Sequence, residues 1–417
     1  MTETIFITSL IIIWIFLLYH VFLSYQGYLY SQEMEREKRR LDNLYTQFSD
    51  LPFVSVLIPA HNEDVVIEAT LKSIAAFAYP KEKYEIILIN DHSTDNTKRI
   101  ALALKEKIEN LRVLDVPENE GRSKGAALNY GVKHAKGKLI AVYDADNTPE
   151  TKALLYLVLN IIRDNSIGAV IGKFRTRNRA RNLLTKFINI ETIFFQWTTQ
   201  AGRGRVFKLT TIPGTNFIVR KKLLEEIGYW DPNALTEDTD VSIKLYQTGR
   251  WIKMVPYSIT WEEEPERFTV WLKQRTRWAL GNLQVIFKYL PKFFSLKKKK
   301  IYVDIVYFFL LYFMFFLAII GSLYVFLTGG LGLTTLNLEG PFILLWILAI
   351  ILFMVEVGIT LTTERGENTL ENMLLTFIMY FTYTQLWTFI MIRVFIIKLR
   401  NIFTRKRIVW DKTKREG

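Results

Sequence analysis

Long uncharged apolar stretches lie toward both ends of the chain and frame a middle part with a different pattern. Four stretches contain no Asp, Glu, Lys or Arg, at positions 5–32, 305–338, 340–355 and 372–392. A helix that spans a membrane needs roughly 20 apolar residues, so the first, second and fourth are long enough, while Glu356 ends the shorter third. Buried core helices are the alternative, but runs of this length and aromatic content are rare in soluble folds. We therefore predict α-helical membrane segments on both sides of the middle part.

The middle part, from Phe53 onward, alternates short apolar runs with longer amphipathic ones. The apolar runs predict strands at 54–58, 85–89, 112–115 and 139–143, and helical spacing occurs at 64–77, 98–108 and 126–135. Strands that are apolar throughout and alternate with helices are typical of an α/β fold with a mostly parallel sheet covered on both faces. Ligands bind such sheets beyond the carboxyl ends of the strands. The polar groups that follow three of these strands should therefore converge on one crevice, and they lie at 61–63, 91 and 144–146.

These patterns divide the chain into five parts. We predict a membrane anchor at 1–32, a polar linker at 33–52, an α/β domain with an interfacial helix at 53–290, membrane helices at 301–398 and a basic tail at 399–417. The first apolar stretch has neither a positive leader nor a small-residue cleavage site, and basic residues follow it at 36–40. It is therefore expected to be the uncleaved anchor of a multi-pass protein of the cell membrane, with the N-terminus outside and the α/β domain in the cytoplasm.

The net charge of +13 is concentrated beside the apolar stretches. Basic residues cluster at 36–40, 297–300 and 398–415, where they keep loops in the cytoplasm and attract anionic lipid. Nucleic-acid binding is the competing explanation of a high pI. No nucleic-acid-binding motif accompanies the charge, so we expect membrane lipid and not nucleic acid as a partner. The chain contains no cysteine, which excludes disulfides, thiol catalysis and cysteine metal sites.

The predicted spans conflict with the charge of the C-terminal tail. If the α/β domain is cytoplasmic and all three later stretches span, the tail ends outside, although its basic residues favour the inside. One stretch is therefore expected to be interfacial or re-entrant, and the pattern does not say which. Glu356 either contacts a polymer hydroxyl in a channel or reaches the interface. The 410–415 segment either lies on the inner leaflet or folds under the α/β domain.

Two carboxylates directly after a predicted strand are candidates for a metal site. Asp144 and Asp146 stand two positions apart around a turn and can share one divalent ion. Mg²⁺ and Mn²⁺ prefer carboxylate and phosphate oxygens, and such an ion would neutralise a departing diphosphate. A lone Asp-x-Asp is more often a solvated turn, so its meaning depends on its neighbours.

Those neighbours form an ordered series of motifs. In chain order they are 59–63 (Pro-Ala-His-Asn-Glu), 90–97 (Asn-Asp-His-Ser-Thr-Asp-Asn-Thr), 121–129 (Gly-Arg-Ser-Lys-Gly-Ala-Ala-Leu-Asn), 144–146 (Asp-Ala-Asp), 213–217 (Pro-Gly-Thr-Asn-Phe), 236–238 (Thr-Glu-Asp) and 274–278 (Gln-Arg-Thr-Arg-Trp). The series resembles family-2 inverting glycosyltransferases, whose nucleotide-sugar fold, called GT-A, is Rossmann-like with a mostly parallel sheet. The last motif resembles the Gln-x-x-Arg-Trp signature of processive members, which make cellulose, chitin, hyaluronan and poly-N-acetylglucosamine. The resemblance covers about residues 53–285.

The resemblance implies a nucleotide-sugar side of the site. Its expected members are Ala60, Asn62, Glu63, Asp91, Lys124 and Asp144. Asp91 would accept hydrogen bonds from uracil or ribose, although a helix cap or an Asx turn also explains it. Lys124 would reach the phosphates, with a solvated lysine as the alternative. Asp146, together with Asp144, would bind Mg²⁺ or Mn²⁺.

The resemblance also implies an acceptor side. Asp238 is expected to be the general base that takes a proton from the acceptor hydroxyl, with Glu237 beside it as a tuning group. The 236–238 motif also fits a capping start for the helix expected at 241–247. Contacts to the acceptor or the diphosphate are expected from Gly214, Thr215, Gln274, Arg275, Arg277 and Trp278. An arginine can clamp diphosphate oxygens, and an indole can stack on a sugar ring. An amphipathic helix with a buried Trp278 is the alternative.

Together these motifs predict a processive membrane glycosyltransferase. It would transfer sugar from a UDP-sugar, N-acetylglucosamine before glucose, to a growing β-linked polysaccharide with inversion at the anomeric carbon, coupled to export. The expected partners are the UDP-sugar, the polysaccharide acceptor, membrane lipid and a small accessory membrane protein. Transfer of a single sugar to a lipid or glycan acceptor is the alternative enzyme, and an inactive membrane scaffold is the alternative without catalysis.

Overall fold

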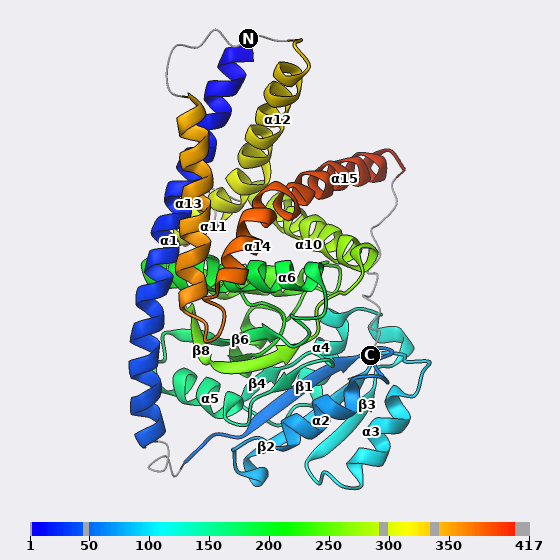
Figure 1. Cartoon of the computed structure of the whole chain (residues 1–417). Helices are drawn as coiled ribbons and strands as arrows, with labels where there is room; N and C mark the ends of the chain where they lie inside the picture. The colour runs from blue at the N-terminus through cyan, green and yellow to red at the C-terminus, as the bar shows by residue number, and fades with distance from the viewer. Residues whose placement is uncertain (1, 45–49, 292–298, 334–341, 405–417) are drawn as a thin grey trace.

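A computed structural model describes residues 2–44, 50–291, 299–333 and 342–404. It consists of an α/β domain and a set of long apolar helices that stand on it (Figure 1). The long helices gather at the end of the molecule where the N-terminus lies, and the sheet lies at the opposite end. The 410–415 segment of the tail falls outside the described residues.

One eight-stranded sheet forms the centre of the α/β domain. Its strands are β1 Val54–Ala60, β2 Tyr84–Asn90, β3 Leu111–Asp115, β4 Leu139–Val142, β5 Thr148–Pro149, β6 Ile167–Thr176, β7 Phe217–Arg220 and β8 Trp251–Glu262. Their order is β3-β2-β1-β4-β7-β6-β8-β5. The pairs β2–β3, β1–β2, β1–β4 and β6–β8 are parallel, whereas β4–β7, β6–β7 and β5–β8 are antiparallel. The predicted mostly parallel α/β sheet is therefore confirmed, with a mixed second half.

Alternation along the strands builds two apolar cores, one on each face of the sheet. Leu57 packs in the core covered by α4 (Lys124–His134), and its neighbour Ile58 packs in the core covered by α2 (Ile67–Ala75) and α5 (Ala153–Arg163). Successive side chains of a strand point to opposite faces, which is why neighbours divide between the cores. The helices predicted at 64–77, 98–108 and 126–135 are present with shifted ends. The other helices of the domain are η2 Lys81–Lys83, α3 Thr97–Lys105, η3 Glu118–Glu120, α6 Leu183–Phe194, η4 Phe195–Gly202, α7 Arg203–Phe207, α8 Lys221–Glu226, α9 Glu237–Gln247 and α10 Phe268–Tyr289.

The first helix, α1 (Thr2–Leu44), runs without interruption through much of the predicted linker at 33–52. Its polar end is docked on the α/β domain by three ion pairs: Glu33–Arg205 (2.9 Å), Glu37–Lys253 (2.8 Å) and Asp42–Lys152 (2.9 Å). The charged residues in the first part of the predicted polar linker therefore form the docking face of a helix, which continues up to Leu44.

Two glycines allow α1 to cross the π-helix η4 in backbone contact. A Cβ on Gly27 would lie 2.1 Å from the carbonyl oxygen of Trp197, and a Cβ on Gly202 would lie 2.2 Å from that of Leu23. A side chain at either position would clash with the main chain of the other helix, so only glycine fits. The crossing fixes the position of α1 along the α/β domain.

Within the described residues, four helical stretches are long and apolar enough to cross a membrane: Thr2–Asn43, Val306–Gly330, Leu344–Thr362 and Leu370–Asn401. The last one is divided at Thr382, whose backbone leaves the helical region (φ −121°, ψ −78°). The helices after the α/β domain are α11 Lys299–Phe309, η6 Leu310–Phe315, α12 Phe316–Gly330, α13 Phe342–Thr362, α14 Leu370–Phe381 and α15 Tyr383–Thr404. α12 and α13 stand beside α1, whereas α15 leans away and packs against α10 (Figure 1).

Candidate active site

The loops after β1 and β2 pack on each other at the carboxyl edge of the sheet. Asp91 follows β2 directly, is buried, and its amide donates to the carbonyl of Ala60 (2.8 Å). Oδ1 of Asn62 accepts from the amide of Thr94 (2.7 Å). Asn62 and His92 adopt positive φ angles of 54° and 57°, a strained conformation that clusters at functional sites. The predicted nucleotide-pocket residues Ala60, Asn62 and Asp91 are therefore neighbours in the structure.

The hydrogen bonds around Asp91 do not make it a helix cap. Its Oδ1 lies 2.8 Å from Nδ1 of His92. The first turn of α3 is instead held by Asp95, whose Oδ1 accepts from the amide of Thr97 (3.0 Å). Glu63 joins the same loops through its amide, which donates to Oγ1 of Thr97 (2.7 Å). Asp95 thus supplies the local turn bonds that the alternative explanation assigns to Asp91.

Lys124 connects two sides of the site. It is the first residue of α4, and its Nζ lies 2.6 Å from Oδ1 of Asp144 and 3.7 Å from Oε1 of Glu237. The same nitrogen donates to the carbonyl of Gly214 (2.9 Å). Burial lowers the pKa of Lys124, but the charges of Asp144 and Glu237 outweigh burial and raise that pKa above its ordinary value. The lysine is therefore held charged among carboxylates and is not a solvated surface residue.

The Asp-x-Asp turn is tied to the 213–217 loop by a chain of hydrogen bonds. The amide of Asp144 donates to Oγ1 of Thr215 (3.0 Å), and that hydroxyl donates to Oδ1 of Asn147 (2.6 Å). Nδ2 of Asn147 in turn donates to Oδ1 of Asp146 (3.1 Å). Asp144 is therefore bonded directly to Thr215, which is predicted on the acceptor side, and Asp146 is linked to Thr215 through Asn147.

The carboxylates of Asp144 and Asp146 fit a divalent cation by their chemistry. Burial raises the pKa of Asp144, Lys124 lowers it, and the neighbouring charge of Asp146 raises it again. Two like charges this close disfavour each other, and a bound divalent cation would offset the repulsion. Among the described residues no three His, Asp or Glu side chains converge on one point. Mg²⁺ or Mn²⁺ bound by these two carboxylates would therefore complete its ligand shell with phosphate oxygens and water.

Asp238 is a recessed carboxyl near the start of α9 that keeps part of its side chain accessible. Burial, reinforced by the charge of Glu237, raises its pKa to about 7, and Lys124 opposes this rise. Its Oδ1 accepts from the amide of Thr239 (2.7 Å). Thr236 occupies the N-cap position without a side-chain cap bond, so a capping start does not account for this motif. A carboxyl with a pKa near 7 suits a general base at neutral pH.

Gly214 lies between the predicted base and Lys124. Its φ is +84°, and a Cβ there would lie 3.0 Å from Oδ2 of Asp238 and 3.3 Å from Nζ of Lys124. Glycine adopts such a φ readily. Any other residue at this position would place side-chain atoms against both Asp238 and Lys124, so the glycine keeps the space between them open.

The two arginines of the 274–278 motif on α10 have different surroundings. Arg275 is 1% exposed, and its guanidinium donates to Oε2 of Glu191 (2.7 Å) and Oε1 of Gln274 (2.8 Å). It also lies 4.1 Å from the centre of the Trp278 ring. A buried guanidinium needs a counter-charge, which Glu191 supplies. Because Arg275 is bound inside the protein, its position does not match the predicted contact with a diphosphate. The charge of Arg277, in contrast, acts on Asp238 and lowers the pKa of that carboxyl.

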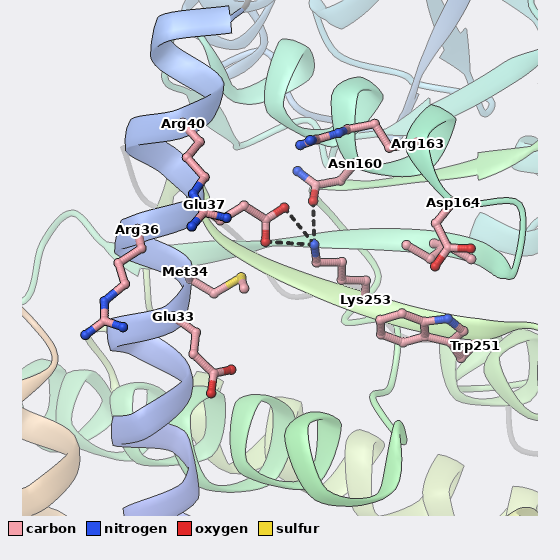
Figure 2. Close-up of a pocket in the computed structure, with 11 residues that line it drawn as sticks. Glu33, Met34, Arg36, Glu37, Arg40, Asn160, Arg163, Asp164, Trp251 and Lys253 are labelled. Atoms are coloured by element: carbon pink, nitrogen blue, oxygen red, sulfur yellow. Dashed lines mark hydrogen bonds and ion pairs between the residues drawn. The ribbon is translucent and has the colours of Figure 1, made fainter.

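A separate cavity of about 500 Å³ lies where the polar end of α1 meets α5 and β8 (Figure 2). Its lining includes Arg36, Glu37 and Trp251 and none of the predicted site residues. Nζ of Lys253 donates there to Oε1 of Glu37 (2.8 Å) and Oδ1 of Asn160 (2.7 Å). This cavity lies at the docking face of α1 and not at the candidate active site.

The loops and carboxylates described above lie in a segment with known relatives. Residues 52–281, more than half of the chain, match the family described as glycosyltransferase like family 2. The chain belongs to glycosyltransferase family 2. The resemblance drawn from the ordered motifs is therefore confirmed, and the cluster around Lys124 lies inside the segment that matches this glycosyltransferase family.

Similar glycosyltransferases cover much or all of the chain. The probable glycosyltransferase YdaM of Bacillus subtilis (strain 168) is 46% identical over 416 residues, which is 100% of this chain and 98% of the relative. The poly-beta-1,6-N-acetyl-D-glucosamine synthase of Staphylococcus aureus (strain COL) is 36% identical over 251 residues, which is 60% of this chain and 59% of the synthase. The solved structure of mannosyltransferase PcManGT from Pyrobaculum calidifontis in complex with GDP-Man and Mn²⁺ covers 93% of this chain and 100% of its own, with a TM-score of 0.59 and 18% identity. The predicted GT-A fold with added apolar helices is confirmed.

Three polar residues near the predicted site are not among the site residues predicted from the sequence. Asn147 directly follows the Asp-x-Asp, and Asn216 lies inside the 213–217 motif with a φ of 47°, so their positions in the sequence are a usable signal. Glu191 stands 84 residues from Arg275, on a helix without a motif. No local pattern points to Glu191, because only the tertiary fold brings it to α10.

Proposed function

We propose that this family-2 glycosyltransferase moves a sugar from a UDP-sugar to the end of a growing β-linked polysaccharide, with inversion at the anomeric carbon. The observation that carries the proposal is the position of Lys124. It contacts the predicted donor ligand Asp144 and the carbonyl of Gly214, which borders the predicted base Asp238. Donor and acceptor sides thus lie within reach of one side chain, as a single displacement at one carbon requires.

In the proposed reaction Asp238 takes the proton of the acceptor hydroxyl while the hydroxyl oxygen attacks the anomeric carbon from the face opposite UDP. The bond between that carbon and the diphosphate oxygen breaks, and UDP leaves with the electron pair. Lys124 and Arg277 direct positive charge to the departing diphosphate. Mg²⁺ or Mn²⁺, when held by Asp144 and Asp146, would neutralise the same diphosphate.

The nucleotide part of the donor is proposed to bind in the loops that hold Ala60, Asn62, Glu63 and Asp91. We place N-acetylglucosamine first among the sugars and glucose second. The relative named poly-beta-1,6-N-acetyl-D-glucosamine synthase supports this order, since it matches 60% of this chain. The Gln-x-x-Arg-Trp motif at 274–278 supports a processive reaction.

We infer a multi-pass membrane protein whose α/β domain is cytoplasmic. α1, α12 and α13 are the proposed spans, and the turn after α13 lies against the α/β domain (Figure 1). The break at Thr382 and the packing of α15 on α10 make α14 and α15 the proposed re-entrant or interfacial segment. This assignment returns the basic tail to the cytoplasmic side, as its charge favours. Membrane lipid and a small accessory membrane protein stay predicted partners.

The proposed function is tested by incubating the purified full-length protein with radiolabelled UDP-sugars and Mg²⁺ or Mn²⁺, and then sizing the products. We expect a long polymer from UDP-N-acetylglucosamine. A product with one added sugar would contradict processivity and support the single-transfer alternative. Absence of incorporation from every UDP-sugar by folded protein would sink the proposed function and support an inactive scaffold.

A further inference from the structure

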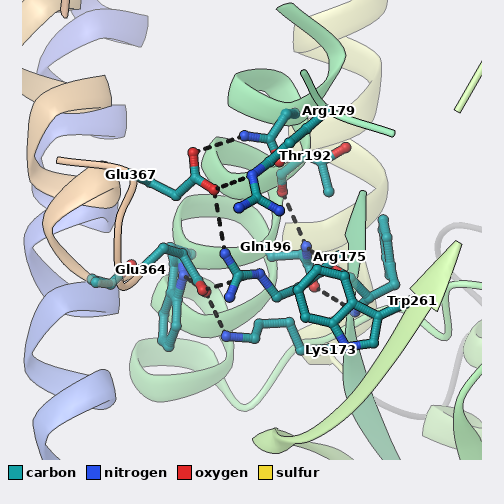
Figure 3. Close-up of polar contacts among 12 residues, drawn as sticks. Lys173, Arg175, Arg179, Thr192, Gln196, Trp261, Glu364 and Glu367 are labelled. Carbon is teal, nitrogen blue, oxygen red and sulfur yellow. Dashed lines mark hydrogen bonds and ion pairs between the residues drawn. The ribbon is translucent and has the colours of Figure 1, made fainter. Parts of the chain in front are cut away.

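The turn between α13 and α14 inserts two carboxylates into the α/β domain (Figure 3). Glu364 and Glu367 are 5% and 3% exposed, respectively, although both belong to a short connection between helices. Such connections usually run over the surface. Removing two carboxylates from water costs free energy unless charged partners and hydrogen bonds surround them. The burial of these two carboxylates therefore requires specific partners in the α/β domain.

Glu364 is held by β6 and by η4. Its Oε1 lies 2.5 Å from Nζ of Lys173 and accepts from Nε1 of Trp197 (2.8 Å). Its second oxygen, Oε2, lies 3.6 Å from Nε of Arg175. Lys173 is itself buried, so this ion pair is screened little by solvent.

Glu367 is held by two arginines and an amide. Its Oε1 lies 3.3 Å from Nη2 of Arg175 and 3.2 Å from Nε of Arg179. Nδ2 of Asn189 donates to its other oxygen, Oε2 (3.0 Å). We name Lys173, Arg175 and Arg179 the cationic socket. Figure 3 shows both carboxylates of the turn pointing into this socket.

The socket is linked to the 213–217 loop through the main chain of β6. The carbonyl of Lys173 accepts from Nδ2 of Asn216 (3.1 Å), and the amide of Gly172 donates to the carbonyl of Asn216 (2.7 Å). These bonds hold Asn216 at its positive φ of 47°, which is uncommon for residues other than glycine. The next residue toward the N-terminus is Thr215, which binds the amide of Asp144. The position of Lys173 therefore sets the position of a loop that contacts the candidate site.

A second link runs across the sheet from Arg175. In the strand register Arg175 of β6 is paired with Trp261 of β8, and Trp261 is paired with Thr148 of β5. The Arg175 guanidinium lies 5.0 Å from the centre of the Trp261 ring. Thr148 stands two positions after Asp146. Arg175, which pairs with both Glu364 and Glu367, is thus also connected to the Asp-x-Asp turn.

We propose that Glu364 and Glu367 are positioning residues for sugar transfer. Their turn holds the 213–217 loop and the Asp-x-Asp turn in a fixed place relative to the membrane helices. The inference rests on the proposed function, because it takes Asp144 and Asp238 as groups that act on the reaction. A displacement of about 1 Å at reacting groups costs on the order of 10²-fold in rate. The nucleotide loops follow β1 and β2, with β4 and β7 between them and the socket. The contacts to the nucleotide, unlike the contact of Asp144, should therefore keep their geometry and hold the KM for the donor nearly constant.

The test measures kcat and the KM for UDP-N-acetylglucosamine, or for whichever UDP-sugar the wild type uses, in the full-length protein. Glu364→Gln and Glu367→Gln keep the size of the side chain and remove its charge. We expect kcat to fall about 10- to 100-fold and KM to stay within about 2-fold. Glu371→Gln is the matched control, because Glu371 pairs with Lys186 (2.6 Å) beside the same turn but is 63% exposed. This control should leave kcat unchanged.

Two further variants separate positioning from folding. Glu364→Asp keeps the negative charge and should retain part of the turnover that Glu364→Gln loses. If the Gln variants do not fold, Trp197→Phe removes one donor to Glu364 and keeps its ion pair, and kcat should still fall several-fold. Unchanged kcat in folded variants, or an equal loss in Glu371→Gln, would overturn the proposal. A wild-type protein without transferase activity would overturn the proposed function instead.

Discussion

Asp238 is the residue on which the proposed reaction depends most. Asp238→Asn keeps the size of the side chain and removes the proton acceptor, so we expect kcat to fall by about 10²- to 10⁴-fold. Asp115→Asn is the matched control, because Asp115 ends β3 as a half-exposed carboxylate paired with Lys98 (2.8 Å). Unchanged polymer yield from folded Asp238→Asn protein would show that the base is another residue.

The raised pKa of Asp238 predicts a pH dependence with a definite sign. Below about pH 7 the carboxyl is protonated and cannot take a proton, so kcat/KM should rise about tenfold per pH unit and level off above pH 7. The charge of Glu237 contributes to the raised pKa. Glu237→Gln should therefore move the inflection to lower pH, as measured from about pH 5 to about pH 9. A profile that is flat across this window would contradict the assignment.

The motifs predict which residues meet at the site better than they predict how each is used. Lys124, Asp144 and Asp238 each stand in a motif at the end of a strand or the start of a helix, and the parallel sheet brings such ends together. The burial of Arg275 against Glu191 has no local signal, because the two residues belong to helices far apart in the sequence. Ion pairs of this kind are set by tertiary packing and cannot be inferred from spacing.

At the scale of helices and strands, the crossing of α1 and η4 gives a stability prediction. Gly202→Ala would place a methyl group 2.2 Å from the carbonyl oxygen of Leu23. Overpacking of this kind costs typically about 1–3 kcal/mol, so the Tm of the detergent-purified protein should fall. Gly329→Ala is the control, since a Cβ at Gly329 in α12 meets no atom within 4 Å. Equal Tm values for the two variants would contradict the backbone contact.

The helix break inside the uncharged stretch at 372–392 could not be predicted from the sequence pattern. Its length satisfies the rule for a spanning helix, yet the helix breaks at Thr382, where the sequence has neither proline nor glycine. The hydroxyl of Tyr383 donates to Glu191 (2.8 Å) and accepts from Nε1 of Trp271 (2.9 Å). These bonds hold the start of α15 on the α/β domain. A hydrophobic pattern contains no information about such distant partners.

At the scale of the whole molecule, the order of the parts follows from sequence because each part has its own hydrophobic period. Uncharged runs predict the long helices and alternating runs predict the sheet. The docking of the parts does not follow in the same way. The charges at 33–44 are predicted only as part of a polar linker, and three of them pair with Arg205, Lys253 and Lys152 of the α/β domain.

The proposed topology can be read with single cysteines, because the chain contains none of its own. Leu333→Cys lies after α12, where the side chain is 71% exposed, and Arg365→Cys lies in the exposed part of the turn after α13. A membrane-impermeant maleimide should label the first position in intact cells and the second only after permeabilisation. The reverse pattern would contradict a cytoplasmic α/β domain.

If α1 spans the membrane as proposed, its uninterrupted course would make the protein responsive to the bilayer itself. Its 43 residues form a rod of about 65 Å, whereas the hydrocarbon core of a bilayer is roughly 30 Å thick. A spanning helix adapts to a thinner or thicker bilayer by tilting. Because the lower end of this rod is fastened to the α/β domain, any tilt also rotates the sheet and the loops at its edge. With the proposed topology, acyl-chain length would become a variable of catalysis, and vesicles of graded lipid length should give graded rates of the proposed sugar transfer.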